Sequence, residues 1–284
     1  MKKIYAFCAI VFCACCFLFA GIRSTTVQAA IQTDIELYAL DEWCQKYIQI
    51  PDSAMKSYQI EVPGGQQARY RVVDGESVTV SSSGLIEPAK ETWYVNGNMS
   101  TTFPQGGPNE KVEIENVYGK SVVQVTTASQ TYDITVNVKD YAEQYAETVM
   151  DEYLHNKITE GMSDFEKLEA IAAFPAQYDY SASASGYIGM IVTGGGDCWA
   201  STSAIIHLCE KVQLQAHVRY AVNDGNAGSG HRNAAVKIGD SVYVVEAGYN
   251  ETKPRNYNIW EEKTGFDYSI EDGKVEIKQY DGFS

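Results

Sequence analysis

A cysteine placed after a run of glycines is the first candidate for chemistry in this chain. The segment GGGDCWAST, residues 194–202, puts Cys198 directly before the helix-like pattern WASTSAIIHLCEKV. We therefore expect Cys198 to begin a helix, where free backbone N–H groups and the helix dipole lower the pKa of a thiol. The same N–H groups can stabilise an oxyanion on a carbonyl under attack. The position suits a nucleophile, and the alternative is a small buried thiol.

A nucleophilic thiol needs a general base, and His231 is the best-placed histidine. It follows the loop NDGNAGSG and begins the strand-like segment HRNAAVKI. His207 comes nine helical positions after Cys198, so it falls on the opposite face of the predicted helix. We expect His155 to be a solvated residue at a helix end and His217 to be packed within a strand.

Glu246 is the candidate acid that would orient this base. Gly239-Asp240 predicts a tight hairpin, and the returning segment SVYVVEAG brings Glu246 to the level of His231. A carboxylate beside an imidazole fixes its tautomer and stabilises its charged form. Taken alone, Glu246 would be a surface acid at a strand end. Together, Cys198, His231 and Glu246 complete the order cysteine, histidine, acid.

The elements that must position these residues begin near residue 140, where the apolar period changes from two to about 3.6. The segment KDYAEQYAETVMDEYLHNKI predicts a helix. Ser163 and Glu166 have the spacing of a capping box for a second helix, which Pro175 ends or kinks. Strand-like segments then follow to the end of the chain. Helices first and an antiparallel sheet afterwards predict an α+β domain over residues 140–284.

The residues before this domain predict a different architecture. Residues 56–139 alternate apolar and polar side chains between turn signals such as PGG, SSSG and YGK, which favours an antiparallel β-sandwich. In the segment 30–55, DIELYALDEWCQKYIQI has near-helical apolar spacing and predicts a short amphipathic helix with Cys44 on its apolar face.

Residues 1–29 have the pattern of a secretory leader. A basic start precedes an apolar run without charge, and Val27 and Ala29 suit cleavage after Ala29. An uncleaved membrane anchor is the alternative. Cleavage would remove Lys2, Lys3 and Arg23 and take the formal charge from −15 to −18. We therefore expect a secreted or cell-surface protein without membrane insertion, and its acidity argues against nucleic acid as a partner.

The mature chain would keep three cysteines: Cys44, Cys198 and Cys209. An odd number leaves at least one thiol unpaired. Cys44 and Cys209 can either pair with each other or be buried thiols. Eleven helical residues separate Cys198 from Cys209, which is too far for a disulfide.

The segments SDFEKLEAIAAFPAQYDYS, GGGDCWASTSAIIHLCEKVQLQAHVRY and HRNAAVKIGDSVYVVEAG together resemble the transglutaminase-like, papain-related core of bacterial secreted proteins. The resemblance covers residues 140–250 and implies helices packed on an antiparallel sheet. It assigns Cys198 as nucleophile, His231 as base and Glu246 as orienting acid. VTVSSSGLIEPA and GKSVVQV resemble bacterial immunoglobulin-like modules, which act as spacers or binding domains.

Two positions depart from the family pattern. The family usually has Asp where this chain has Glu246, and an aromatic residue where it has Asn233. The backbone N–H of Cys198 is one oxyanion donor, and a second donor can come from Gln177, Tyr178 or Tyr180. Trp199 can line the site or anchor the helix, and we favour the second.

The resemblance implies thiol attack on a peptide or glutamine carboxamide carbonyl through a thioester, which either water or a lysine amine resolves. We favour hydrolysis over cross-linking, because water is always present and nothing in the sequence identifies a site for an amine. The substrate would be a protein or peptide, associated with the cell wall or surface. We expect no cofactor and no metal. The alternative is a non-catalytic surface module with a degenerate transglutaminase-like domain.

Overall fold

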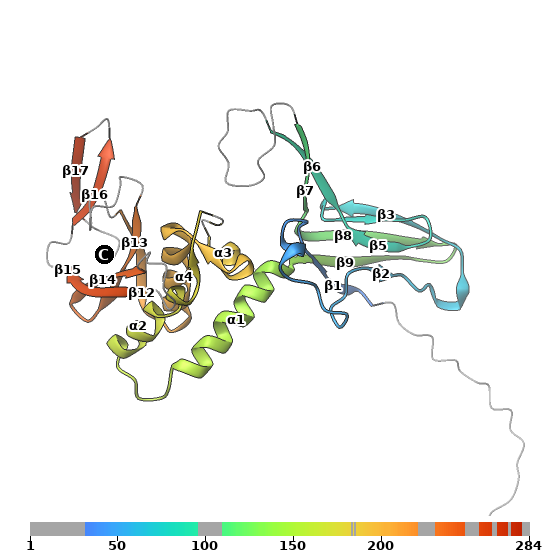
Figure 1. The fold of residues 1–284 in the computed structure, drawn as a ribbon. Helices are drawn as coiled ribbons and strands as arrows, with labels where there is room; N and C mark the ends of the chain where they lie inside the picture. The colour runs from blue at the N-terminus through green and yellow to red at the C-terminus, as the bar shows by residue number, and fades with distance from the viewer. Residues whose placement is uncertain are drawn as a thin grey trace, which may run out of the picture.

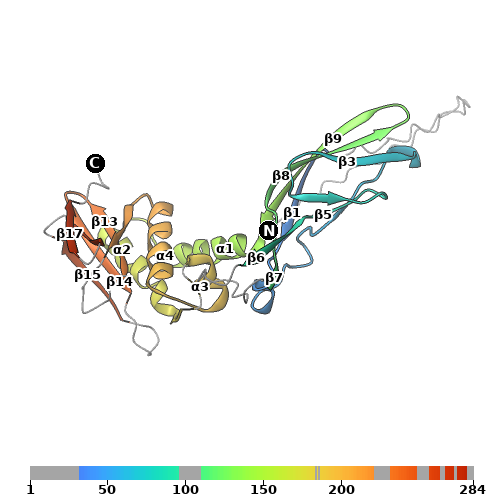
Figure 2. The ribbon, with the colours of Figure 1, turned by 90° about the horizontal axis from the view of Figure 1, so that it is seen from above.

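The computed structural model describes residues 32–95, 110–182, 184, 186–220, 231–247, 256–262, 266–271 and 274–279. The predicted leader lies outside these residues. Helix α1 (Tyr141–Lys157) joins an all-β part, β1 to β9, to a part that contains the other α-helices and β12 to β15 (Figure 1). The view from above shows α1 running between the two (Figure 2). Among the described residues, no helix combines the length and the apolar character needed to cross a bilayer.

The all-β part consists of two main sheets that share one apolar core. One sheet has the order β1-β9-β8-β3 and the other β2-β5-β4, while β6 and β7 form a separate pair. Leu37, Ile86 and Val123 are fully buried in the shared core. The strands are β1 (Asp34–Ala39), β2 (Tyr58–Gln59), β3 (Ala68–Asp74), β4 (Val78–Val80), β5 (Leu85–Pro88), β6 (Lys90–Val95), β7 (Glu110–Asn116), β8 (Gly119–Thr127) and β9 (Thr131–Asp140).

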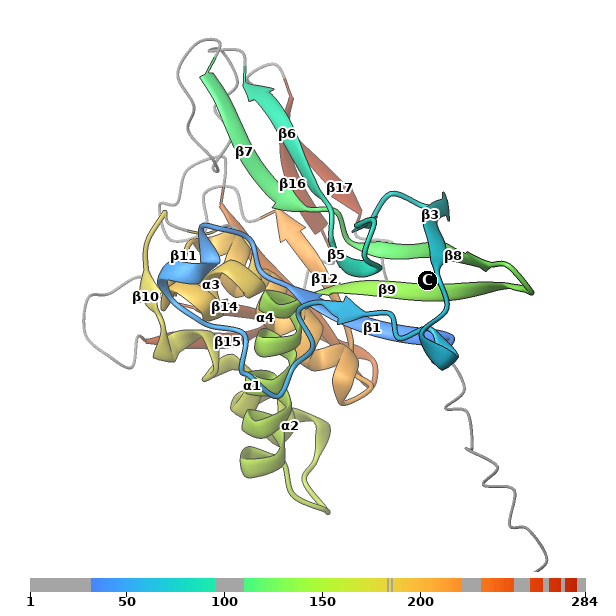
Figure 3. The ribbon, with the colours of Figure 1, turned by 90° about the vertical axis from the view of Figure 1, so that its right-hand side faces the viewer.

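The expected helix in segment 30–55 is wrong. Its first half is strand β1, which pairs in parallel with β9. Ile35, Leu37 and Ala39 point into the core, because successive side chains of a strand face opposite sides of the sheet. Its second half holds a single 3-10 turn, Cys44–Lys46. Cys44 is buried there in a small cluster with residues of α1 and α3, and Figure 3 shows this segment in blue against those helices.

The second part contains helices followed by an antiparallel sheet, so the described chain has the mixed α and β content of an α+β fold. The sheet has the order β12-β13-β14-β15, and α4 packs against β12 and β13. The helices are α2 (Asp164–Ala172), α3 (Tyr187–Thr193) and α4 (Cys198–Lys211). The strands are β10 (Asp179–Tyr180), β11 (Gly195–Gly196), β12 (Gln215–Tyr220), β13 (Arg232–Ile238), β14 (Ser241–Ala247), β15 (Tyr257–Glu262), β16 (Phe266–Glu271) and β17 (Lys274–Gln279).

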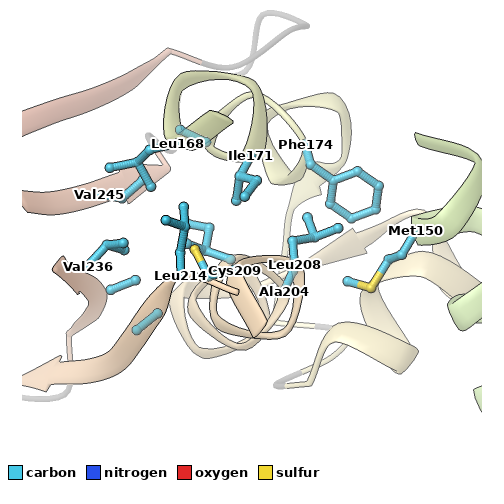
Figure 4. Close-up of a cluster of buried hydrophobic side chains, with 14 of the residues drawn as sticks. Met150, Leu168, Ile171, Phe174, Ala204, Leu208, Cys209, Leu214, Val236 and Val245 are labelled. Atoms are coloured by element: carbon cyan, nitrogen blue, oxygen red, sulfur yellow. The ribbon is translucent and has the colours of Figure 1, made fainter. Parts of the chain in front are cut away.

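The core of this part holds α4 in place. Leu208 and Cys209 of α4 are fully buried between Ile171 of α2 and Val236 of β13 (Figure 4). Cys209 is a free thiol here, and Cys44 is free in a different cluster, so the two do not pair. The buried face of α4 therefore fixes the helix on the sheet and leaves its first residue, Cys198, only partly covered.

The capping box predicted at Ser163 is present. Ser163 Oγ accepts a hydrogen bond from the Glu166 backbone N–H over 3.3 Å, and Glu166 Oε2 accepts one from the Ser163 backbone N–H over 2.7 Å. We expect Ser163→Ala to lower the free energy of unfolding by about 1 kcal/mol, because an N–H group of the first turn loses its acceptor. Denaturant unfolding measures this, with Ser163→Asp as the control that keeps an acceptor. Unchanged unfolding of the alanine variant would contradict the prediction.

Candidate active site

The glycines before Cys198 allow the chain to turn and to pack closely. Gly194 ends α3 with a left-handed φ of 84°, and Gly195–Gly196 form β11, which pairs with β10. Asp197 then caps α4, accepting a hydrogen bond from Ala200 N over 3.0 Å. Cys198 is therefore the first residue of the helix, as the sequence predicts.

The structure brings Cys198, His231 and Glu246 together. His231 Nε2 lies 2.7 Å from Glu246 Oε2, and the imidazole also hydrogen-bonds the thiol of Cys198. Since Nε2 faces the carboxylate, Nδ1 is the nitrogen left for the thiol. The hairpin that joins β13 to β14 sets this arrangement, because Ile238 pairs with Ser241 across the predicted turn.

The three side chains shift one another's protonation. Burial opposes ionisation of Cys198, but hydrogen bonds from His231 and from the Arg232 backbone N–H outweigh it and lower the pKa of the thiol. Hydrogen bonds with Cys198 and Glu246 raise the pKa of His231 to about 9, although burial acts in the opposite direction. Both shifts favour a thiolate beside an imidazolium, which is the reactive form of a cysteine nucleophile.

Of the candidate second oxyanion donors, Tyr180 is the one that reaches the thiol. Its hydroxyl hydrogen-bonds Cys198, and burial together with the negative charge of that thiolate raises the pKa of Tyr180. A hydroxyl that stays protonated can donate to an oxyanion. Gln177 instead donates to the Ala173 carbonyl over 3.3 Å, and Tyr178 packs on Phe174 with ring centroids 5.3 Å apart.

Trp199 lies at the surface beside Cys198, which fits a residue that lines the site better than the favoured role of helix anchor. It is 41% exposed, and the Arg232 guanidinium lies 4.5 Å from its ring centroid. Arg232 Nη1 also donates to the His231 carbonyl over 2.7 Å. The sequence does not reveal Arg232 as a site residue, because an arginine at a strand start carries no signal that distinguishes it from a surface residue.

The other histidines that the structure describes lie elsewhere. His207 pairs with Glu147 over 2.6 Å and stacks on Tyr187 with ring centroids 4.6 Å apart, on the face of α4 away from the thiol. His155 is exposed in the last turn of α1, whereas His217 is exposed on β12 rather than packed. Within the described ranges, no three His, Cys, Asp or Glu side chains gather as a metal site requires.

Comparisons with known proteins give little beyond this geometry. No family model matches the chain, and no curated protein matches it. A solved structure described as "Crystal structure of a TGase" aligns with 37% of this chain and 31% of its own, at 13% identity and a TM-score of 0.30. The chain thus covers less than a third of that structure's length, and the function has to be inferred from the site itself.

Proposed function

We propose that the chain is a cysteine-dependent acyl-transfer enzyme that acts on peptide or glutamine carboxamide bonds through a thioester. The observation that supports this most strongly is the hydrogen-bonded series from Cys198 at a helix N-terminus to His231 and on to Glu246. A thiol, an imidazole and a carboxylate in this order support the roles of nucleophile, base and orienting acid.

In this mechanism the Cys198 thiolate attacks the carbonyl carbon and forms a C–S bond. The oxyanion that develops is stabilised by the Cys198 backbone N–H and the Tyr180 hydroxyl. The C–N bond then breaks, and the His231 imidazolium gives its proton to the leaving amine or ammonia. Water, deprotonated by His231, attacks the thioester, releases the carboxylic acid and regenerates the thiol.

We propose hydrolysis over cross-linking, because water can resolve the thioester without a dedicated site for a lysine amine. The leader-like residues 1–29 support a secreted protein, which we propose acts at the cell wall or surface. In this proposal the all-β part is an immunoglobulin-like spacer, and the partner is a protein or peptide substrate.

The pH dependence of Cys198 alkylation tests the ion pair directly. In the wild-type protein we expect fast labelling by iodoacetamide to persist down to about pH 6, because His231 holds the thiolate. The rate of labelling should change near pH 9, because His231 loses its proton there and the ion pair is lost. In His231→Ala the burial of the thiol remains and its hydrogen bond is lost, so labelling should rise only above about pH 8.5.

Since Cys44 and Cys209 are also free thiols, labelling is assigned to Cys198 by peptide mass mapping. Identical pH profiles for the wild type and His231→Ala would show an ordinary thiol and contradict the proposal.

For the reaction itself, a glutamine peptide is incubated with and without a primary amine. Release of ammonia with free acid as the product supports hydrolysis, and amide formation supports cross-linking instead.

A further inference from the structure

A buried polar chain lies behind the catalytic acid, and the reaction steps above do not use it. Asn233 donates its amide Nδ2–H to Glu246 Oε2 over 3.1 Å, and the same oxygen faces His231 Nε2. The Asn233 amide oxygen accepts from Arg219 Nη1 over 3.4 Å, and Arg219 Nη2 pairs with Glu262 Oε2 over 2.9 Å. These contacts form one series that ends on the carboxylate of Glu246.

The strands explain why these side chains meet. Arg219 on β12 pairs in register with Asn233 on β13, and the pairing of Ala234 with Val245 puts Glu246 beside Asn233. Ala234 and Val245 point into the core under the helices, so their neighbours in sequence face the other side of the sheet. Asn233 is 1% exposed and Arg219 3%, which shields their hydrogen bonds from water and strengthens them.

The orientation of the Asn233 amide follows from its neighbours. A guanidinium has only donors, and an ionised carboxylate has only acceptors. The amide oxygen must therefore face Arg219 and the amide nitrogen must face Glu246, because the reversed amide would put like groups against each other. Arg219, itself held by Glu262, thus fixes a buried donor that points at the catalytic acid.

We infer that Asn233 is a positioning residue, held by the Arg219–Glu262 pair, that keeps Glu246 Oε2 on His231 Nε2. This inference rests on the proposed function of the Cys198–His231–Glu246 site. It also accounts for the departure from the family pattern at position 233, because a glutamate has one more rotatable bond than an aspartate and gains a second anchor from Asn233.

Replacing Asn233 with alanine tests this, because neither residue carries a charge. The charged and titratable groups around His231 would all be kept: Cys198 and Asp197 at the start of α4, Tyr180 on β10, Arg232 on β13, Glu246 on β14, and Arg219 and Glu262 behind Asn233. A change in the pH profile would therefore report on the placement of Glu246 and not on a lost charge.

We expect Asn233→Ala to move the acid limb of Cys198 alkylation up by about one pH unit and to slow labelling at pH 6 about tenfold. Arg219→Met frees the Asn233 amide to rotate. It should shift the acid limb in the same direction, by less than Asn233→Ala does. Ser121→Ala is the control, because Ser121 is a fully buried, hydrogen-bonded residue of the all-β part. It should lower the melting temperature and leave the labelling profile unchanged.

An Asn233→Ala profile that superimposes on the wild type would overturn the inference and leave the proposed function standing. A wild-type thiol that ionises only near pH 8.5 would instead overturn the proposed function, and this inference with it. If Arg219→Met does not fold, Asn233→Ala beside Ser121→Ala still decides the question.

Discussion

Replacing Glu246 with alanine is expected to slow acylation of Cys198 at pH 7 by about 10²- to 10⁴-fold. The carboxylate lies 2.7 Å from His231 Nε2, where it holds the proton on that nitrogen and leaves Nδ1 to accept the proton of the thiol. It is also one of the two hydrogen-bond partners that raise the pKa of His231 to about 9. Without it the imidazolium loses a partner and the ring can rotate. The burst of p-nitrophenol from an activated ester measures the acylation rate.

Glu261→Ala is the matched control for this variant. It removes one carboxylate from the neighbouring strand β15, where Glu261 accepts a hydrogen bond from Ser241 over 2.7 Å at the surface. Its burst should equal that of the wild type. Glu246→Asp should fall between the wild type and Glu246→Ala, since the shorter side chain withdraws the carboxylate by about 1.5 Å from His231 and Asn233. An unchanged burst in Glu246→Ala would remove Glu246 from the mechanism.

The residues that the structure brings together at the site were predictable because local patterns determine their positions. A glycine run followed by an apolar helix pattern puts Cys198 at a helix start, and a two-residue turn sets the register between β13 and β14. Short-range geometry then brings His231 and Glu246 to the same level.

The features that the sequence does not reveal depend on contacts between distant parts of the chain. Residues 34–39 have both alternating and near-helical apolar positions, and the partner that selects a strand, β9, begins about a hundred residues later. In the sequence, Asn233 stands out only as a departure from a family pattern. Its role depends on Arg219 and Glu262, which come from the two edge strands of the sheet. No spacing in the sequence shows that such side chains meet.

Gly196→Ala is expected to slow alkylation of Cys198 at pH 6 by about 10²-fold, because a displacement of about 1 Å is enough to disrupt a catalytic geometry. A Cβ at Gly196 would lie 2.6 Å from Ala200 Cβ and 2.9 Å from Met190 Cβ. Neither neighbour is the end of a flexible side chain, so the first turn of α4 has to move away from α3. We also expect the free energy of unfolding to fall by about 1–3 kcal/mol.

Gly194→Ala separates this displacement from a general loss of stability. At Gly194 a Cβ would meet nothing within 4 Å, but its φ of 84° strains any other residue by about 1–2 kcal/mol. The two variants should therefore lose similar stability in denaturant unfolding, while Gly194→Ala keeps the alkylation rate of the wild type. Equal alkylation rates in both variants would mean that the contact of Gly196 with Ala200 does not set the position of the thiol. A loss of alkylation rate in Gly196→Ala alone would show why a glycine is required before Asp197. The start of α4 packs against α3 with no room for a side chain at that position.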